Sequence, residues 1–134
     1  MTNVPMSRSL RLALLADAGA SGATAALLVA AAGPLEQLLG LPVALMREAG
    51  MLLIPYVILV LFVASRATAS VTAVTAIIGI NAVWTAASAL LLVSGWVSPT
   101  ALGIAFVLAQ ALAVGAFAVI QYACLRQVGR SATA

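Results

Sequence analysis

Four long runs of apolar residues follow one another along the chain, and short segments containing glycine, proline or arginine separate them. Each run exceeds the roughly 20 apolar residues that a helix needs to cross the hydrocarbon core of a bilayer. The pattern predicts membrane-spanning helices over residues 10–32, 42–65, 69–95 and 98–125. We therefore expect an all-α integral membrane protein that folds as a four-helix bundle.

Gly33 and Pro34 mark the end of the first helix, because glycine often closes a helix and proline cannot continue one. Pro42 suits the first position of the second helix, because the N–H that proline lacks would have no hydrogen-bond partner within the helix there. Between them, residues 35–39 combine leucines with two polar side chains. We expect this segment to form one helical turn that lies on the outer surface of the membrane.

Two further prolines shape the later part of the chain. Ser98 followed by Pro99 is typical of a helix start, with a hydroxyl cap and a proline in the first turn. Pro55 lies in the middle of the second helix and should kink it beside Tyr56, because proline removes one backbone donor. Neighbouring helices can satisfy the freed carbonyl in a membrane protein.

The composition agrees with this class of protein. Hydrophobic residues make up 65% of the 134 positions and charged residues only 7%, whereas soluble domains are roughly half apolar and a quarter charged. The mean hydropathy is +1.23. Four spans and their links use the whole length, so we expect a single transmembrane domain over residues 1–134.

The arginines predict the orientation of the chain. Five of the six fall on one side of the expected spans: Arg8, Arg11, Arg66, Arg126 and Arg130. Since short cytoplasmic segments are enriched in Lys and Arg, both termini should be cytoplasmic in a bacterial inner (plasma) membrane. The opposite side carries Glu36, Arg47 and Glu48.

A cleaved signal peptide is an alternative interpretation of the N-terminal segment. Arginines precede an apolar stretch there, and Ala30 to Ala32 resemble a cleavage site. Asp17 and several small or polar residues interrupt the apolar stretch, however, and cleavage would leave only three spans. We therefore keep the first helix as a membrane span.

The residue inventory excludes several chemistries. The chain has one cysteine and no histidine, so an intrachain disulfide, histidine-ligated haem, the usual Cys/His zinc site and a Ser-His-Asp triad are impossible. We read Cys124 as a small apolar residue near the end of the fourth helix. Because the arginines are scattered, no nucleic-acid patch is expected. We expect no cofactor, no metal and no enzymatic activity.

A weak internal repeat relates the two halves of the chain. Residues 17–29 match residues 81–93 at most positions when conservative substitutions are allowed, and residues 42–45 match residues 99–102. Both helical hairpins would start on the same side of the membrane. They would then be parallel repeats related by an axis along the membrane normal, if the similarity reflects a duplication.

The repeat places polar side chains at equal spacing on the first and third helices. Positions i, i+4 and i+7 share one helix face. These positions are Asp17, Ser21 and Thr24 in the first helix and Asn81, Thr85 and Ser88 in the third. Both trios should look inward, and Gln110 of the fourth helix lies within reach. Bonds between helices, each worth about 0.6 kcal/mol, would account for the uncharged members.

Asp17 requires a separate explanation. An aspartate at the centre of a membrane helix costs about 2.5–3.5 kcal/mol on insertion scales and marks a candidate functional site. It could instead be structural, either held neutral by burial while donating to Asn81 or paired with Arg11 or another arginine of the cytoplasmic side. We read Trp84 and Tyr56 as packing residues.

The chain resembles the small multidrug resistance transporters in its size and in having a carboxylate in its first helix. Their carboxylate is a glutamate, and their further motifs are absent here. No residue roles are carried over from that family.

Two functional hypotheses follow. The first is a non-enzymatic interaction or assembly module, whose small-residue faces, such as Gly19 to Ala23, bind further copies of the chain or a larger membrane protein. The second is a proton-coupled transporter of small solutes, or a conducting oligomer, in which Asp17 exchanges a proton. The sequence favours the first, because it offers only one buried acidic residue and no second ionisable group as a relay.

Overall fold

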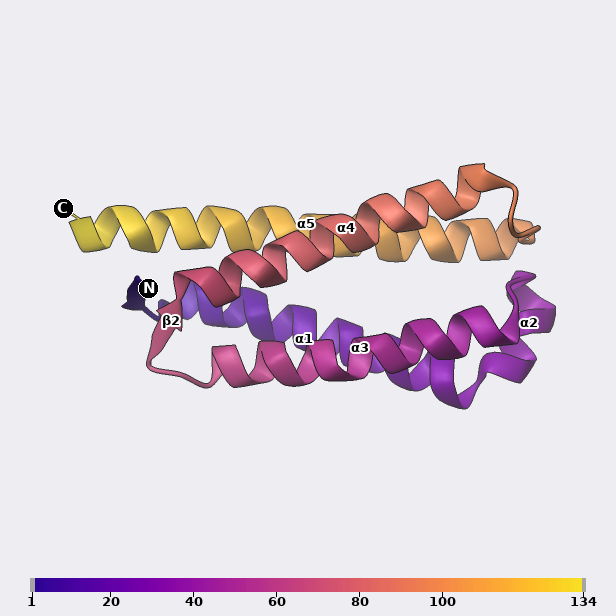
Figure 1. Cartoon of the computed structure of the whole chain (residues 1–134), viewed down its shortest axis with the longest axis horizontal. Helices are drawn as coiled ribbons and strands as arrows, with labels where there is room; N and C mark the ends of the chain where they lie inside the picture. The colour runs from indigo at the N-terminus through magenta and orange to yellow at the C-terminus, as the bar shows by residue number, and fades with distance from the viewer. Residues whose placement is uncertain (1, 134) are drawn as a thin grey trace.

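The computed structural model describes residues 2–133 and is mostly helical (Figure 1). Its elements are β1 (Asn3–Pro5), α1 (Arg8–Ala30), α2 (Ala32–Leu39), α3 (Val43–Ala64), β2 (Thr68–Ser70), α4 (Val71–Ser94) and α5 (Ala101–Thr133). Among these residues, the helices α1, α3, α4 and α5 are long and apolar enough to cross a membrane. The expectation of four candidate spans is confirmed.

The link between the first two spans is more helical than expected. The predicted turn at residues 35–39 belongs to the eight-residue helix α2. Gly33 and Pro34 lie in the first turn of α2, so they begin a helix and do not close α1. Gly40 ends α2 in the left-handed conformation, with a φ of 70°, which side chains with a Cβ rarely adopt.

The start of α5 differs from the predicted one. The helix begins at Ala101, and the cap is Thr100, whose hydroxyl oxygen accepts the N–H of Gly103 at 3.1 Å. The prediction of a Ser98 cap with Pro99 in the first turn was wrong, since both residues precede the helix. The far end was also underestimated, because α5 continues to Thr133 and not to residue 125.

A two-stranded antiparallel ribbon was not expected from the apolar pattern. Strands β1 and β2 pair with Val4 opposite Ala69, and both of these side chains are buried. The ribbon fastens the N-terminal segment to the link between α3 and α4. Ser70 then caps α4 by accepting the N–H of Ala73 at 3.2 Å.

The long helices form two antiparallel hairpins, α1 with α3 and α4 with α5 (Figure 1). The hairpins meet unequally, because α1 packs along α5 whereas α3 and α4 barely touch. Both termini and the α3–α4 link lie at one end of the molecule, and α2 lies at the other. We call these the terminal end and the α2 end.

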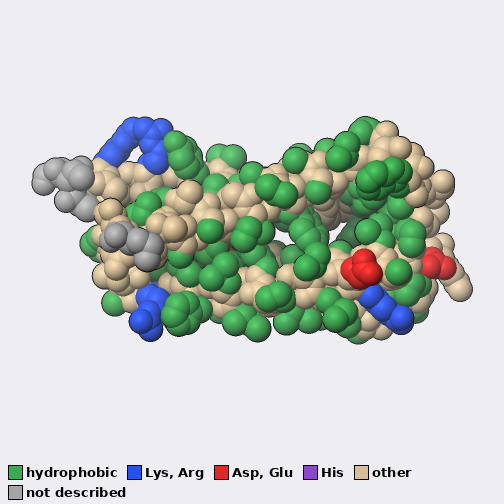
Figure 2. Space-filling model, in the orientation of Figure 1, with side chains coloured by type: hydrophobic (Ala, Val, Ile, Leu, Met, Phe, Trp, Pro, Cys, Tyr) green, Lys and Arg blue, Asp and Glu red, His purple; other side chains and the backbone are tan. Residues whose placement is uncertain are grey.

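Charged side chains gather at the two ends, while apolar side chains cover the length between them (Figure 2). Large apolar side chains are exposed on all four long helices, among them Leu12, Leu52, Val83 and Leu112. The larger buried cluster lies toward the terminal end and includes Leu10, Leu14, Val60 and Ile77. A smaller cluster around Leu28, Leu39 and Met46 lies toward the α2 end.

Candidate functional site

The side chain of Asp17 is completely buried and accepts hydrogen bonds from all four long helices. Ser21, one turn further along α1, donates to Oδ1 at 3.0 Å. Tyr56 of α3 lies 2.6 Å from Oδ2, Asn81 of α4 lies 2.9 Å from it and Gln121 of α5 lies 2.8 Å from it. We call these five residues the Asp17 cluster.

The cluster is closed on itself by two further contacts. The amide nitrogen of Asn81 also donates to Oε1 of Gln121 at 3.1 Å, and the Tyr56 hydroxyl lies 2.8 Å from Oδ1 of Asn81. No buried side-chain nitrogen or oxygen in the described part of the chain lacks a partner. The carboxyl group is therefore held in one position by donors on four separate helices.

Tyr56 has two oxygen neighbours but only one hydroxyl hydrogen. Its oxygen lies 2.6 Å from Oδ2 of Asp17 and 2.8 Å from Oδ1 of Asn81. When Asp17 is ionised, Tyr56 donates to Asp17, and its contact with Asn81 then holds no hydrogen. When Oδ2 carries a proton, that proton can be donated to Tyr56, which frees the hydroxyl hydrogen for Asn81.

The expected alternative of a pairing between Asp17 and Arg11 does not occur. The guanidinium of Arg11 instead donates to the backbone carbonyl of Arg66 at 3.0 Å, at the terminal end. No cluster of His, Cys, Asp or Glu suited to a metal ion occurs among the described residues. The donors around Asp17 are thus uncharged side chains.

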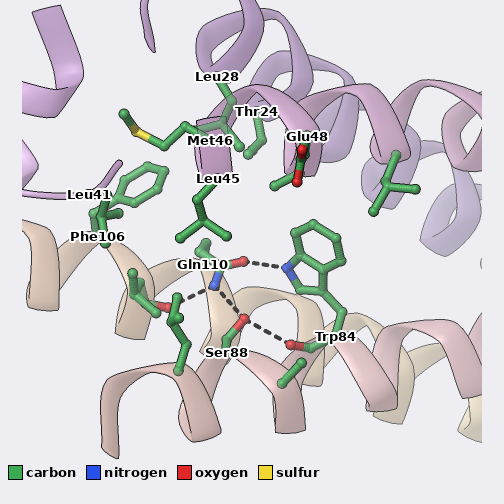
Figure 3. A pocket seen from close by; sticks show the side chains of 15 residues that line it. Thr24, Leu28, Leu41, Leu45, Met46, Glu48, Trp84, Ser88, Phe106 and Gln110 are labelled. Carbon is green, nitrogen blue, oxygen red and sulfur yellow. Dashed lines mark hydrogen bonds between the residues drawn. The ribbon is translucent and has the colours of Figure 1, made fainter. Parts of the chain in front are cut away.

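A second polar cluster lies nearer the α2 end (Figure 3). The indole N–H of Trp84 donates to Oε1 of Gln110 at 2.8 Å, and Nε2 of Gln110 donates to the hydroxyl of Ser88 at 2.9 Å. Gln110 thus joins α4 to α5 and not the Asp17 cluster. Trp84, expected only as a packing residue, supplies a hydrogen bond as well.

The predicted polar stripes are only partly brought together. Asp17, Ser21 and Asn81 meet in one cluster, and Ser88 joins the other. The hydroxyl of Thr24 donates to the Ala20 carbonyl of its own helix at 2.8 Å. Thr85 similarly donates to the Asn81 carbonyl at 2.9 Å. Both threonines bond within their own helices, as hydroxyl residues in helices often do, and the Thr85 hydroxyl also lies 3.4 Å from the Ala111 carbonyl oxygen of α5.

Sequence reasoning missed Tyr56 and Gln121 as members of the site. The position of Gln121 carries a usable signal, because it follows Gln110 by 11 residues, which is close to three full helical turns. The two amides therefore lie on one face of α5, and the face that Gln110 turns toward α4 also carries Gln121. Tyr56 follows Pro55 directly, but nothing in the spacing points it at Asp17.

A groove separates α3 from α4. It consists of two adjoining cavities of about 290 and 400 Å³ that share Leu52 and Trp84 as lining residues. Figure 2 shows the surface hollowed between these helices toward the α2 end. Ser21, Tyr56 and Asn81 line the second cavity. The α3–α4 groove, as we call it, therefore reaches the hydrogen-bond partners of Asp17.

The sequence matches no known protein family, and neither curated proteins nor solved structures provide a match. The function must therefore be argued from the geometry of the two polar clusters and the groove.

Proposed function

We propose that the chain forms a four-helix bundle in a bacterial inner membrane, with both termini in the cytoplasm. Exposed apolar side chains along α1, α3, α4 and α5 support the membrane placement, since lipid can cover them. The arginine-rich terminal end supports the cytoplasmic orientation. As the sequence predicts, we propose that residues 1–134 form a single transmembrane domain.

Within this membrane, we propose that the protein is a small proton-linked carrier whose coupling site is the Asp17 cluster. The observation that carries the proposal is the position of Tyr56. Its hydroxyl lies between the Asp17 carboxyl and Asn81, and it borders the groove. The sequence pointed to no second group beside Asp17 that could relay a proton, whereas the neutral hydroxyl of Tyr56, which can both donate and accept a hydrogen, provides one. This geometry favours the transport hypothesis over the interaction module.

The coupling follows from the single hydrogen of Tyr56. With Asp17 ionised, Tyr56 donates to α1 and the α3–α4 contact through Asn81 is lost. With Asp17 protonated, Tyr56 donates to Asn81 and joins α3 to α4. Since the Tyr56–Asn81 contact is the only side-chain hydrogen bond between these two helices in residues 2–131, a proton on Asp17 strengthens the link between α3 and α4 beside the groove, and its release weakens that link.

The experiment is proton flux into proteoliposomes that contain the purified chain and a pH-sensitive dye, measured across a panel of cations and small solutes. Asp17→Asn keeps the size and most hydrogen bonds of the side chain but cannot exchange a proton, so flux should fall to the level of empty vesicles. Tyr56→Phe should lower flux strongly while leaving Asp17 in place.

Matched controls exist for both variants. Glu36→Gln removes a carboxylate that accepts the Val43 N–H at the α2 end, and Tyr122→Phe removes a hydroxyl from an exposed ring. Both should conduct like the wild type. Flux that persists unchanged in Asp17→Asn would exclude the coupling role of Asp17.

A second candidate is the non-enzymatic interaction or assembly module. One observation favours it: Gly19 and Ala23 are exposed on α1, and a Cβ added at Gly19 would contact nothing within 4 Å. This face is free to meet a helix of another copy or of a larger membrane protein. Gly19→Leu should then abolish a crosslinkable homo-oligomer or partner complex while leaving folding intact.

A further inference from the structure

We infer that the α3–α4 groove holds one acyl chain of a phospholipid whose headgroup carries a primary ammonium, with that ammonium beside Glu48. Phosphatidylethanolamine is the lipid of this chemistry. The inference rests on the proposed membrane placement and names the class of molecule that the proposed carrier would take. Binding itself requires no transport.

The walls of the groove suit a hydrocarbon chain. Apolar side chains, such as those of Leu45, Leu52 and Phe106, make up most of the lining (Figure 3). The groove continues past Leu52 to Pro55 and Leu59. Because α3 and α4 barely touch, the groove can open sideways to the lipid, and a chain can enter without crossing the polar surface.

The length of the groove matches one leaflet of a bilayer. Glu48 and Leu59 both line it, and they are 11 residues apart on α3. At a rise of 1.5 Å per residue this separation is about 16 Å, close to half of the roughly 30 Å hydrocarbon core. A chain that starts at Glu48 therefore ends near the middle of the membrane, as the acyl chain of a lipid in one leaflet does.

The charge of the groove selects the headgroup. Glu48 is exposed and forms no hydrogen bond or ion pair with any residue in the described part of the chain, although it borders an apolar cavity. Glu36, the other carboxylate at this end, accepts the Val43 N–H at 2.9 Å. An ammonium group would pair with Glu48. A purely anionic headgroup would be repelled by Glu48.

The two tryptophans of the chain allow a direct test. Trp84 lines both cavities, whereas Trp96 lies in the α4–α5 link and is 82% exposed. In Trp96→Phe, all tryptophan fluorescence comes from the groove. This protein is reconstituted into phosphatidylcholine vesicles that contain equal small fractions of either phosphatidylethanolamine or phosphatidylglycerol, each with acyl chains brominated at their middle carbons. Bromine quenches only a ring in close contact.

We expect phosphatidylethanolamine to occupy the groove about two- to fivefold more than phosphatidylglycerol, which is the preference that a partly exposed ion pair supplies. Glu48→Gln should remove this preference, and Glu36→Gln, which deletes the same charge while keeping an acceptor for Val43, should retain it. Ala87→Phe, which places a ring in the groove, should reduce quenching by both lipids.

Equal quenching by the two brominated lipids in the parent protein would overturn the inference, because it indicates contact with bulk lipid only. A preference that survives Glu48→Gln would overturn the role of Glu48. If the protein prefers phosphatidylethanolamine but Asp17→Asn leaves proton flux unchanged, the lipid site stands and the carrier function is excluded. If proton flux depends on Asp17 but the protein shows no lipid preference, the carrier function stands and the lipid site is excluded.

Discussion

The hydroxyl oxygen of Tyr56 lies 2.6 Å from Oδ2 of Asp17, although 39 residues separate them in the chain. This contact joins the two helices of the first hairpin, and Asn81 and Gln121 extend it to the second hairpin. The Asp17 carboxyl thereby becomes the common acceptor of the whole helix assembly.

Replacing Asp17 by leucine should destabilise the protein by about 1–3 kcal/mol, because the buried donors of Tyr56, Asn81 and Gln121 lose their acceptor. Asp17→Asn should cost less, since it retains an acceptor oxygen and the shape of the side chain. The measurement is thermal unfolding in detergent followed by circular dichroism. Equal stability of the leucine variant and the wild type would contradict the cluster.

Exchanging Asp17 and Asn81, which occupy aligned positions in residues 17–29 and 81–93, tests the contact between them. Asn81→Asp alone should destabilise the fold, because it places a second carboxyl beside Oδ2 of Asp17, where the amide now lies at 2.9 Å. Adding Asp17→Asn restores one carboxyl and one amide at the site. We expect a coupling of about 0.5–3 kcal/mol in a double-mutant cycle of unfolding midpoints. Strict additivity would mean that the side chains do not interact.

Gly103 allows α5 to approach α2 closely. A Cβ at this position would fall on the Leu39 carbonyl oxygen, so Gly103→Ala should destabilise the protein by about 1–3 kcal/mol. Gly79→Ala is the matched control, since a Cβ there meets nothing within 4 Å and alanine favours a helix. Its stability should stay equal or rise slightly. A harmless Gly103→Ala, measured in the same melts, would argue against this contact.

The orientation can be tested with reporter fusions. Fusions after Arg66 and after Arg130 should both report the cytoplasm, and a fusion near Glu36 should report the exterior, because five of the six arginines lie at the terminal end. An alkaline phosphatase and a fluorescent protein reporter give opposite signals for the two sides. A C-terminus outside the cytoplasm would exclude an even number of spans with a cytoplasmic N-terminus.

The four long helices could be predicted because each is a long apolar run, although Gly33 and Pro34 do not end the first and Ser98 and Pro99 do not begin the last. The meeting of Asp17 and Asn81 was also predictable, since both occupy the same place in similar segments whose polar faces were expected to look inward. Rotation of α3 and α5 about their axes was not predictable from one sequence. Apolar residues cover nearly every face of these helices, so the pattern does not say which side chain turns inward.

The errors at the site have separate causes. Gln110 was expected near Asp17, but α5 is longer than predicted and places Gln121 at that level while Gln110 pairs with Trp84. Tyr56 was read as a packing residue because aromatic rings in a membrane helix usually are. The short ribbon was missed because three-residue strands carry no distinctive periodicity.

The fastenings at the two ends restrict how the protein can move. At the terminal end, the N–H of Met6 donates to the Ala67 carbonyl and the N–H of Val71 donates to the Thr2 carbonyl, which extends the ribbon. At the α2 end, Thr100 donates to the carbonyls of Leu38 and Leu39. The α1–α3 hairpin is therefore tied to the α4–α5 hairpin at both ends, so the two cannot separate by pivoting about one end. The groove between α3 and α4 can then widen only if a helix bends near its middle. Pro55 lies in the middle of α3 and lacks the N–H that would hold that turn, so α3 is expected to bend there.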